Sequence, residues 1–273
     1  MVKNYFSLDE NAVLFNLLRE TQPDWWSIIL KDKELYINIR KGNRVNVYYK
    51  GFSVMELSLS RKKELQAKIH STYMGKGTGG YLEHLDPNCI IENLTAVKQV
   101  IDNNNEKHRT MPEGRCEKEI QGVCYIQGEY IDTEYEFVRE MPQRLITRID
   151  FTTITKAGLI EFVELKRITD KRLFASCGSK KEPEILKQIR DYNDFISYNR
   201  ESICNYYQKV QRIMRSLGVK NRLVECEIEG VVEDVRLLLA GCKVEISATK
   251  KQEIKRMLDL LEKNNIKYEV EVI

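Results

Sequence analysis

Apolar and polar positions in the first hundred residues predict a helix followed by a β-meander. Valine and leucine recur at helical spacing in 8–19, with Asp9 as the expected N-cap. Another helix is expected over 90–104. Between these helices, turn-forming residues separate runs rich in β-branched and aromatic side chains, which we interpret as strands: 25–30, 34–40, 44–50 and 52–60. The tryptophans and tyrosines of this half are expected to fill a core rather than stack on bases.

The rest of the pattern predicts a mixed α/β sheet flanked by helices. A helix is expected near 113–124, and a longer one begins at about Pro183, a residue that suits a first turn, and ends at about Leu217. A final amphipathic helix covers 248–265. Strand-like runs lie between and after these helices: 129–138, 144–154, 159–168, one or two strands within 223–241, and 266–273. Strands and helices in this order form one sheet with helices packed against it.

Chain length and the change of pattern predict two domains. A chain of 273 residues is long for one compact domain, and each half can bury an apolar core. We set the boundary near residue 108, which gives an N-terminal α+β domain of residues 1–108 and a C-terminal α/β domain of residues 109–273. The glycine-rich segment 74–80 lacks the spacing of a phosphate-binding P-loop and is expected to be a mobile loop.

Composition indicates a folded protein in a reducing compartment. Charged residues make up 31% of the chain and hydrophobic ones 42%, values that exclude a disordered chain. The seven cysteines are scattered without a C-x-x-C pair, so we expect free thiols and no zinc site. Because we find neither a leader pattern nor a long apolar run, we expect a cytoplasmic protein that does not enter a membrane. The oligomeric state stays open, a homo-oligomer included.

Charge is informative here through its distribution. The net charge of +3 does not by itself favour a nucleic-acid partner, but the segment 144–190 contains eleven basic and six acidic residues. A polyanion binds clustered positive charge, whatever the total for the chain. An ordinary solvated surface explains the local excess equally well.

The runs 144–154 and 159–168 carry the candidate chemistry. We expect them to form a hairpin, because Gly158 in the four-residue connection can take the positive φ of a tight turn. If the turn centres on Ala157, Asp150 and Glu164 lie directly opposite each other, with Cβ atoms roughly 5 Å apart. Lys166, two residues beyond Glu164, points to the same face.

Two facing carboxylates in largely apolar strands need a cation between them. Asp150 and Glu164 would otherwise repel each other until one took up a proton. Hard oxygen ligands suit Mg²⁺ or Mn²⁺, and the carbonyl of Leu165 could supply a further oxygen. Lys166 could orient the attacking water or stabilise a charged transition state. The alternative is a surface hairpin in which Lys166 makes an incidental cross-strand ion pair.

These residues resemble the PD-(D/E)XK nuclease superfamily. Its pattern of an acid followed on the next strand by (D/E)-x-K corresponds to Ile149-Asp150 and Glu164-Leu165-Lys166, with isoleucine in place of the usual proline. Gln188 and Tyr192, one helical turn apart, fit the Q-x-x-x-Y element of the recombination-exonuclease branch. In isolation that pair is better explained as an edge residue and a core residue.

The resemblance implies a restriction-endonuclease-like core that hydrolyses phosphodiester bonds, most often in DNA, with Mg²⁺ or Mn²⁺. Asp150, Glu164 and the carbonyl of Leu165 would bind the metal, and Lys166, Gln188 and Tyr192 would complete the catalytic site. The family commonly adds an upstream glutamate, for which we favour Glu119 over two other candidates, Glu117 and Glu134. Two alternatives remain, a catalytically silent nuclease-like protein that binds nucleic acid and a structural or interaction protein.

Overall fold

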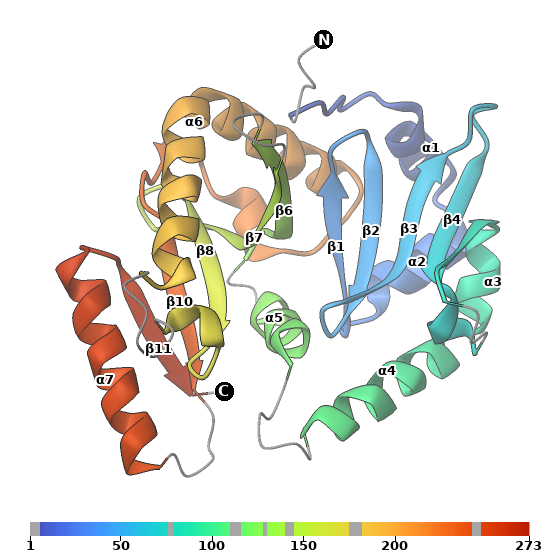
Figure 1. Ribbon diagram of the computed structural model, residues 1–273. Helices are drawn as coiled ribbons and strands as arrows, with labels where there is room; N and C mark the ends of the chain where they lie inside the picture. Colours follow the sequence, from blue (N-terminus) through green and yellow to red (C-terminus); the bar gives the residue numbers. More distant parts are fainter. Residues whose placement is uncertain are drawn as a thin grey trace.

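The described part of the chain is a mixed α/β fold with two sheets and seven α-helices (Figure 1). The structure is a computed structural model, and it describes these residues: 6–75, 79–109, 116–127, 130–139, 145–174, 182–241 and 247–272. No helix within these ranges is long and apolar enough to cross a membrane. The expected loop at 74–80 lies partly outside the described residues.

The first sheet is an antiparallel meander of five strands in chain order. Its tight turns contain residues with positive φ, among them Asn43 and Gly51, as hairpin turns require. The strands are β1 (Leu35–Arg40), β2 (Arg44–Tyr49), β3 (Phe52–Leu59), β4 (Leu65–His70) and β5 (Tyr81–Leu85). The predicted meander is confirmed for β1, β2 and β3. Strands β4 and β5 were not predicted; β5 is largely exposed and has little apolar alternation.

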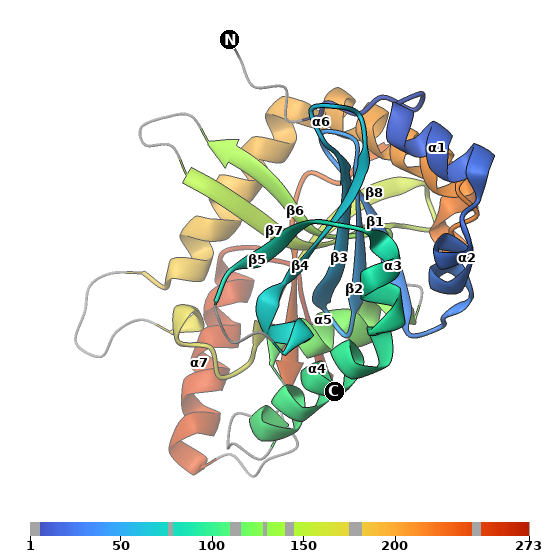
Figure 2. The ribbon, with the colours of Figure 1, turned by 90° about the vertical axis from the view of Figure 1, so that its right-hand side faces the viewer.

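Helices cover one face of this sheet, and Figure 2 shows α1, α2 and α3 on the side away from β6 and β7. The strand predicted at 25–30 is wrong, because this segment is helical and buries Trp25, Trp26 and Ile29 on one face. The expected N-cap at Asp9 is also wrong, since the first helix begins at Val13. The helices are α1 (Val13–Thr21), α2 (Asp24–Lys31), α3 (Pro87–Glu92) and α4 (Leu94–Arg109).

The second sheet confirms the predicted mixed α/β arrangement. Its path is β11-β10-β8-β7-β6, with β9 paired to β8; β6, β7 and β8 are antiparallel, and β10 is parallel to β8 and β11. The strands are β6 (Asp132–Arg139), β7 (Leu145–Ile154), β8 (Leu159–Arg167), β9 (Gly230–Val231), β10 (Arg236–Gly241) and β11 (Tyr268–Val272). The helices are α5 (Glu117–Ile126), α6 (Glu184–Ser216) and α7 (Ala248–Lys263).

The two sheets share one apolar core. Buried residues of β1 and β2 belong to the same cluster as Ile149, Phe162 and Tyr207 of the second half. Helix α5 lies between the sheets and contacts strands of both (Figure 1). Its Gly122 packs so closely on the β2–β3 turn that an added Cβ would lie 2.4 Å from the backbone nitrogen of Gly51. Only glycine permits this approach, which brings α5 beneath the β7–β8 hairpin.

Candidate active site

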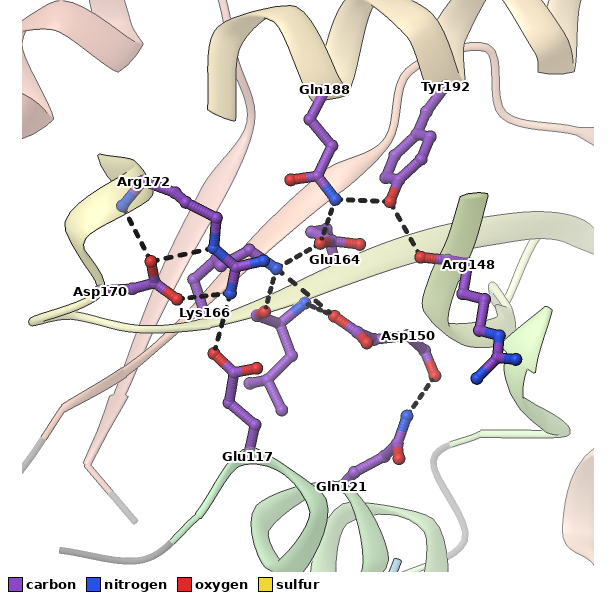
Figure 3. A network of polar contacts seen from close by, with 11 residues as sticks. Glu117, Gln121, Arg148, Asp150, Glu164, Lys166, Asp170, Arg172, Gln188 and Tyr192 are labelled. Atoms are coloured by element: carbon purple, nitrogen blue, oxygen red, sulfur yellow. Dashed lines mark hydrogen bonds and ion pairs between the residues drawn. The ribbon is translucent and has the colours of Figure 1, made fainter. Parts of the chain in front are cut away.

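The β7–β8 hairpin has the predicted register. Gly158 takes a φ of 75°, and its N–H donates to the Thr155 carbonyl at 2.9 Å. Pairing runs from Ile154 with Ile160 to Phe151 with Val163, which centres the turn on Ala157. Asp150 and Glu164 are therefore the next residues along the two strands (Figure 3).

Asp150 lies where the backbone pairing of β7 with β8 ends, and its side chain continues the contact between the two strands. Its carboxylate accepts the backbone N–H of Leu165 at 2.9 Å, so a side chain replaces the next rung of the ladder. Its own carbonyl accepts a hydrogen bond at 2.8 Å from the side chain of Gln121 on α5. These two contacts fix the Asp150 carboxylate at the open end of the hairpin, where it keeps 27% of its side-chain exposure.

The ammonium of Lys166 lies among the oxygens that were predicted to bind a metal. Lys166 and Glu164 are both almost fully buried. The Lys166 Nζ donates to a Glu164 oxygen and, at 2.9 Å, to the carbonyl of Leu165, and it lies 3.8 Å from the Asp150 Oδ2 atom. One positive charge is thus held between two carboxylates and a carbonyl oxygen (Figure 3).

The pKa shifts of the cluster indicate that a positive charge stabilises its two carboxylates. Burial raises the pKa of Asp150 well above its usual value, and repulsion from Glu164 adds to the shift. Burial also raises the pKa of Glu164, although Lys166 opposes the effect. For Lys166, burial alone would lower the pKa, but the attraction of Glu164 and Asp150 outweighs it and raises the pKa. A cation beside the two carboxylates favours their ionised forms.

The donor set fits a hard divalent cation, although it is incomplete by itself. The Oε2 atom of Glu164 is buried and has no hydrogen-bond partner, so one lone-pair face of this carboxylate is unused. Over the described ranges, no three His, Cys, Asp or Glu side chains form a metal-binding group. Mg²⁺ commonly binds one or two carboxylates and completes its shell with water and substrate phosphates. Asp150, Glu164 and the Leu165 carbonyl meet that description.

Helix α6 brings Gln188 and Tyr192 to the carboxylates, as the Q-x-x-x-Y spacing predicted. The Gln188 Nε2 donates to Glu164 at 2.7 Å and to the Tyr192 hydroxyl at 2.6 Å. The Tyr192 hydroxyl donates in turn to the carbonyl of Arg148 on β7 at 2.9 Å. Burial raises the pKa of Tyr192, and the nearby charge of Glu164 adds to the shift, so this hydroxyl stays protonated and acts as a donor.

Two of the three candidates for the upstream glutamate, Glu117 and Glu119, lie in the first turn of α5. Glu117 and Gln121, one turn apart, point toward the β7–β8 hairpin, and the charge of Glu117 contributes to the raised pKa of Asp150. Glu119 is buried in the same first turn, and its role as a metal ligand stays a prediction. Glu134, the third candidate, lies on β6 with a φ of 53°.

Sequence reasoning missed an arginine held beside the site. Asp170 caps a short 3₁₀ helix and grips the Arg172 guanidinium through two side-chain hydrogen bonds of 3.0 and 2.6 Å. An Arg172 nitrogen also lies 3.6 Å from Glu117, and its charge affects the pKa of both Glu164 and Lys166. The D-x-R spacing is typical of a capping turn and could have predicted the pairing of Asp170 with Arg172. It does not predict that this pair lies beside the site.

Three arginines of the basic segment 144–190 are exposed, and two of them, Arg148 and Arg172, lie beside this site (Figure 3). The side chains of Arg148, Arg172 and Arg190 are each more than a third exposed. Three other basic residues of that segment lie outside the described residues: Arg144, Lys180 and Lys181.

Comparison with protein-family models, curated proteins and solved structures finds no match to this chain. The resemblance to the PD-(D/E)XK superfamily therefore rests on the motif residues alone.

Proposed function

We propose that this chain is a metal-dependent nuclease of the PD-(D/E)XK superfamily, with a restriction-endonuclease-like core built on the second sheet. The observation that carries the proposal is the cluster of Asp150, Glu164 and the Leu165 carbonyl around the Lys166 ammonium. Both Glu164 and Lys166 are buried charges, which are costly to maintain and concentrate at functional sites. The glutamate oxygen without a hydrogen-bond partner supports a role for this cluster beyond stability.

Each residue has a defined task in the proposed reaction. Asp150, Glu164 and the Leu165 carbonyl would hold Mg²⁺ or Mn²⁺, which supplies a bound water of lowered pKa and neutralises charge on the phosphate. Lys166 would donate a hydrogen bond to the attacking water, which it orients, or to the non-bridging phosphate oxygens, whose developing charge it stabilises. Gln188 fixes the orientation of Glu164 from α6. Gln121 anchors the backbone of Asp150 from α5.

DNA is the proposed polymer, because it is what most of the family cleaves. Arg148 and Arg172, which are exposed beside the site and paired with Glu136 and Asp170, supply cationic side chains for contact with a phosphodiester backbone.

A cleavage assay tests the proposal. Labelled linear, circular and single-stranded DNA are incubated with Mg²⁺, Mn²⁺ or EDTA, and wild type is compared with Asp150→Ala and Lys166→Ala. We expect metal-dependent cleavage by the wild type and a loss of about a hundredfold or more in both variants. Cleavage that persists in EDTA or survives in both variants contradicts the proposal.

The second candidate is a silent nuclease-like protein that binds nucleic acid without cleaving it. The observation in its favour is that Lys166 already neutralises the two carboxylates, which a permanent ion-pair cluster would also do. Binding of DNA by the wild type, with no cleavage of DNA or RNA under any metal condition, selects this candidate.

A further inference from the structure

A polar cavity of about 260 Å³ lies between the first sheet and the paired strands β6 and β7. On β2, Val45 and Val47 pack into the core, so the alternate residues project toward the opposite face. Two of those alternate residues, Arg44 and Asn46, line the cavity, and Arg148 of β7 lines it from the other side. The N-terminal sheet thus turns its polar face toward the strand that carries Asp150.

Two residues that line the cavity each carry a buried polar atom without a hydrogen-bond partner. Asn46 and Tyr135 are 9% and 4% exposed, and both line the cavity. Neither the Asn46 Oδ1 atom nor the Tyr135 hydroxyl has a partner. Buried polar groups are nearly always satisfied, so these two atoms leave hydrogen bonds for an ordered water or for a polar group of a bound ligand.

Cations and an exposed aromatic ring surround the cavity mouth. Six basic and four acidic residues line it, and Arg44, Lys68 and Arg148 keep 39%, 32% and 60% of their side-chain exposure. Tyr81 is 60% exposed, and the Lys68 ammonium lies 4.4 Å from the centre of its ring. A cation beside an accessible ring suits a phosphate joined to a flat base.

The cavity and the candidate active site share strand β7, which contributes Arg148 to the cavity and Asp150 to the site. Arg148 and Asp150 occupy alternate positions on this strand, so their side chains leave the same face about 7 Å apart (Figure 3). The carbonyl of Arg148 is also the acceptor for Tyr192. A chain of phosphates bound at Asp150 and Glu164 would therefore reach the cavity within one or two nucleotides.

We infer that this cavity binds a single unpaired nucleotide of the polynucleotide whose neighbouring phosphodiester bond is cleaved. This inference rests on the proposed function and assigns a substrate-binding role to the N-terminal sheet. Ligand pockets usually measure about 300–1,000 Å³. A cavity of about 260 Å³ lies just below this range, so it holds at most one nucleotide and no duplex. Arg44 and Arg148 bind the phosphates, Tyr81 stacks on a base, and a small side-chain shift lets Asn46 and Tyr135 bind its polar edge.

Binding of a labelled oligothymidylate in EDTA, measured by fluorescence anisotropy, tests the inference without cleavage. We expect Tyr81→Ala and Arg44→Ala each to weaken binding about tenfold, and Arg44→Ala to lower the salt dependence as well. Tyr135→Phe removes only the unpartnered hydroxyl, so it should weaken binding while the thermal unfolding temperature does not fall. Lys255→Ala, an exposed lysine on α7, is the matched control and should bind like wild type.

Failures of the two proposals are distinguishable. Asp150→Asn should abolish cleavage and retain oligonucleotide binding, because it lies outside the cavity lining. Weaker binding in the Tyr81 and Arg44 variants supports the cavity even if no metal elicits cleavage. Unchanged binding in these variants, or no binding by the wild type, overturns the cavity inference even if cleavage is observed.

Discussion

Lys166 occupies the position in which a divalent cation is proposed to bind. Its ammonium contacts Glu164 and the Leu165 carbonyl and faces Asp150. Metal binding at these oxygens therefore requires the ammonium to shift toward the phosphate or the attacking water. In the free protein, Lys166 and the metal would compete for the same oxygens. In the proposed reaction, both would stabilise the phosphate and the attacking water.

Lys166→Met should make the fold depend on a metal. Removing one partner of a buried ion pair costs about 3–5 kcal/mol, because the carboxylates are left uncompensated. Mn²⁺ at about a hundred times its Kd returns ~2.7 kcal/mol by binding the folded state. We expect thermal unfolding of the variant to shift upward with Mn²⁺ far more than that of the wild type. An equal rise of the unfolding temperature in both proteins, or no rise in either, argues against a position shared by the Lys166 ammonium and the metal.

Asp170 should contribute stability that acid removes. Burial alone would raise its pKa, but hydrogen bonds from Arg172 outweigh burial and lower the pKa to about 2. The usual value is about 3.9, so the contribution is complete above pH ~4 and is lost as the pH falls toward 2. The partly exposed Arg172 reduces its size to about 1 kcal/mol. Urea unfolding of wild type and Asp170→Asn should differ at pH 7 and converge near pH 2; a difference independent of pH contradicts this assignment.

The residues predicted from sequence are those whose positions follow from local periodicity. A two-residue strand repeat fixes Lys166 relative to Glu164, and one helical turn fixes Tyr192 relative to Gln188. The missed residues, Arg172 among them, reach the site through the packing of separate elements, and no short-range pattern contains that information.

At the scale of elements, strong turn signals allowed correct prediction and short apolar runs did not. Gly158 set the register of the hairpin, on which the whole site depends. The segment 25–30 has strand-like composition, but Pro23 and Asp24 favour a helix start, and helical spacing buries its tryptophans. Strand β5 was not predicted, because an edge strand needs few apolar residues and leaves a weak pattern in the sequence.

Tyr207 should hold α6 to the hairpin strands through its hydroxyl. This buried group shares a hydrogen bond of 2.8 Å with Thr152 and contacts Asp132 at 3.2 Å. Tyr207→Phe leaves both partners short of a bond, so we expect a loss of about 1–3 kcal/mol in urea unfolding. Tyr135→Phe is the matched control, because its hydroxyl has no partner, and it should lose nothing. Equal losses in the two variants contradict this role.

At the scale of the whole molecule, the proposed division near residue 108 separates two sheets that pack as one body. The side chains of Asn38 and Thr133 meet at 2.6 Å although they are 95 residues apart in sequence. Arg40 pairs with the buried Asp132 across the same junction. Sequence patterns predicted each half but not this junction, because such distant contacts leave no periodic signal.

Gly122→Ala should disturb both halves together. The added methyl group would lie 2.4 Å from backbone atoms of Lys50 and Gly51, which cannot move as a flexible side chain can. We expect a loss of about 1–3 kcal/mol and a single unfolding transition for the whole chain. Gly230→Ala, whose nearest neighbour is a leucine side chain at 3.2 Å, should be milder. Two separate transitions in the wild type contradict a shared core.

Metal binding and cleavage followed in the same samples test the account most directly. Mn²⁺ is titrated into the protein with labelled DNA, free Mn²⁺ is measured by electron paramagnetic resonance, and cleavage is read from the label. Wild type and Glu253→Gln, an exposed glutamate on α7, should bind Mn²⁺ and cleave in parallel. Glu164→Gln should do neither. Cleavage by Glu164→Gln at the wild-type rate, or no metal binding and no cleavage by the wild type, would contradict the assignment of this chain as a metal-dependent nuclease.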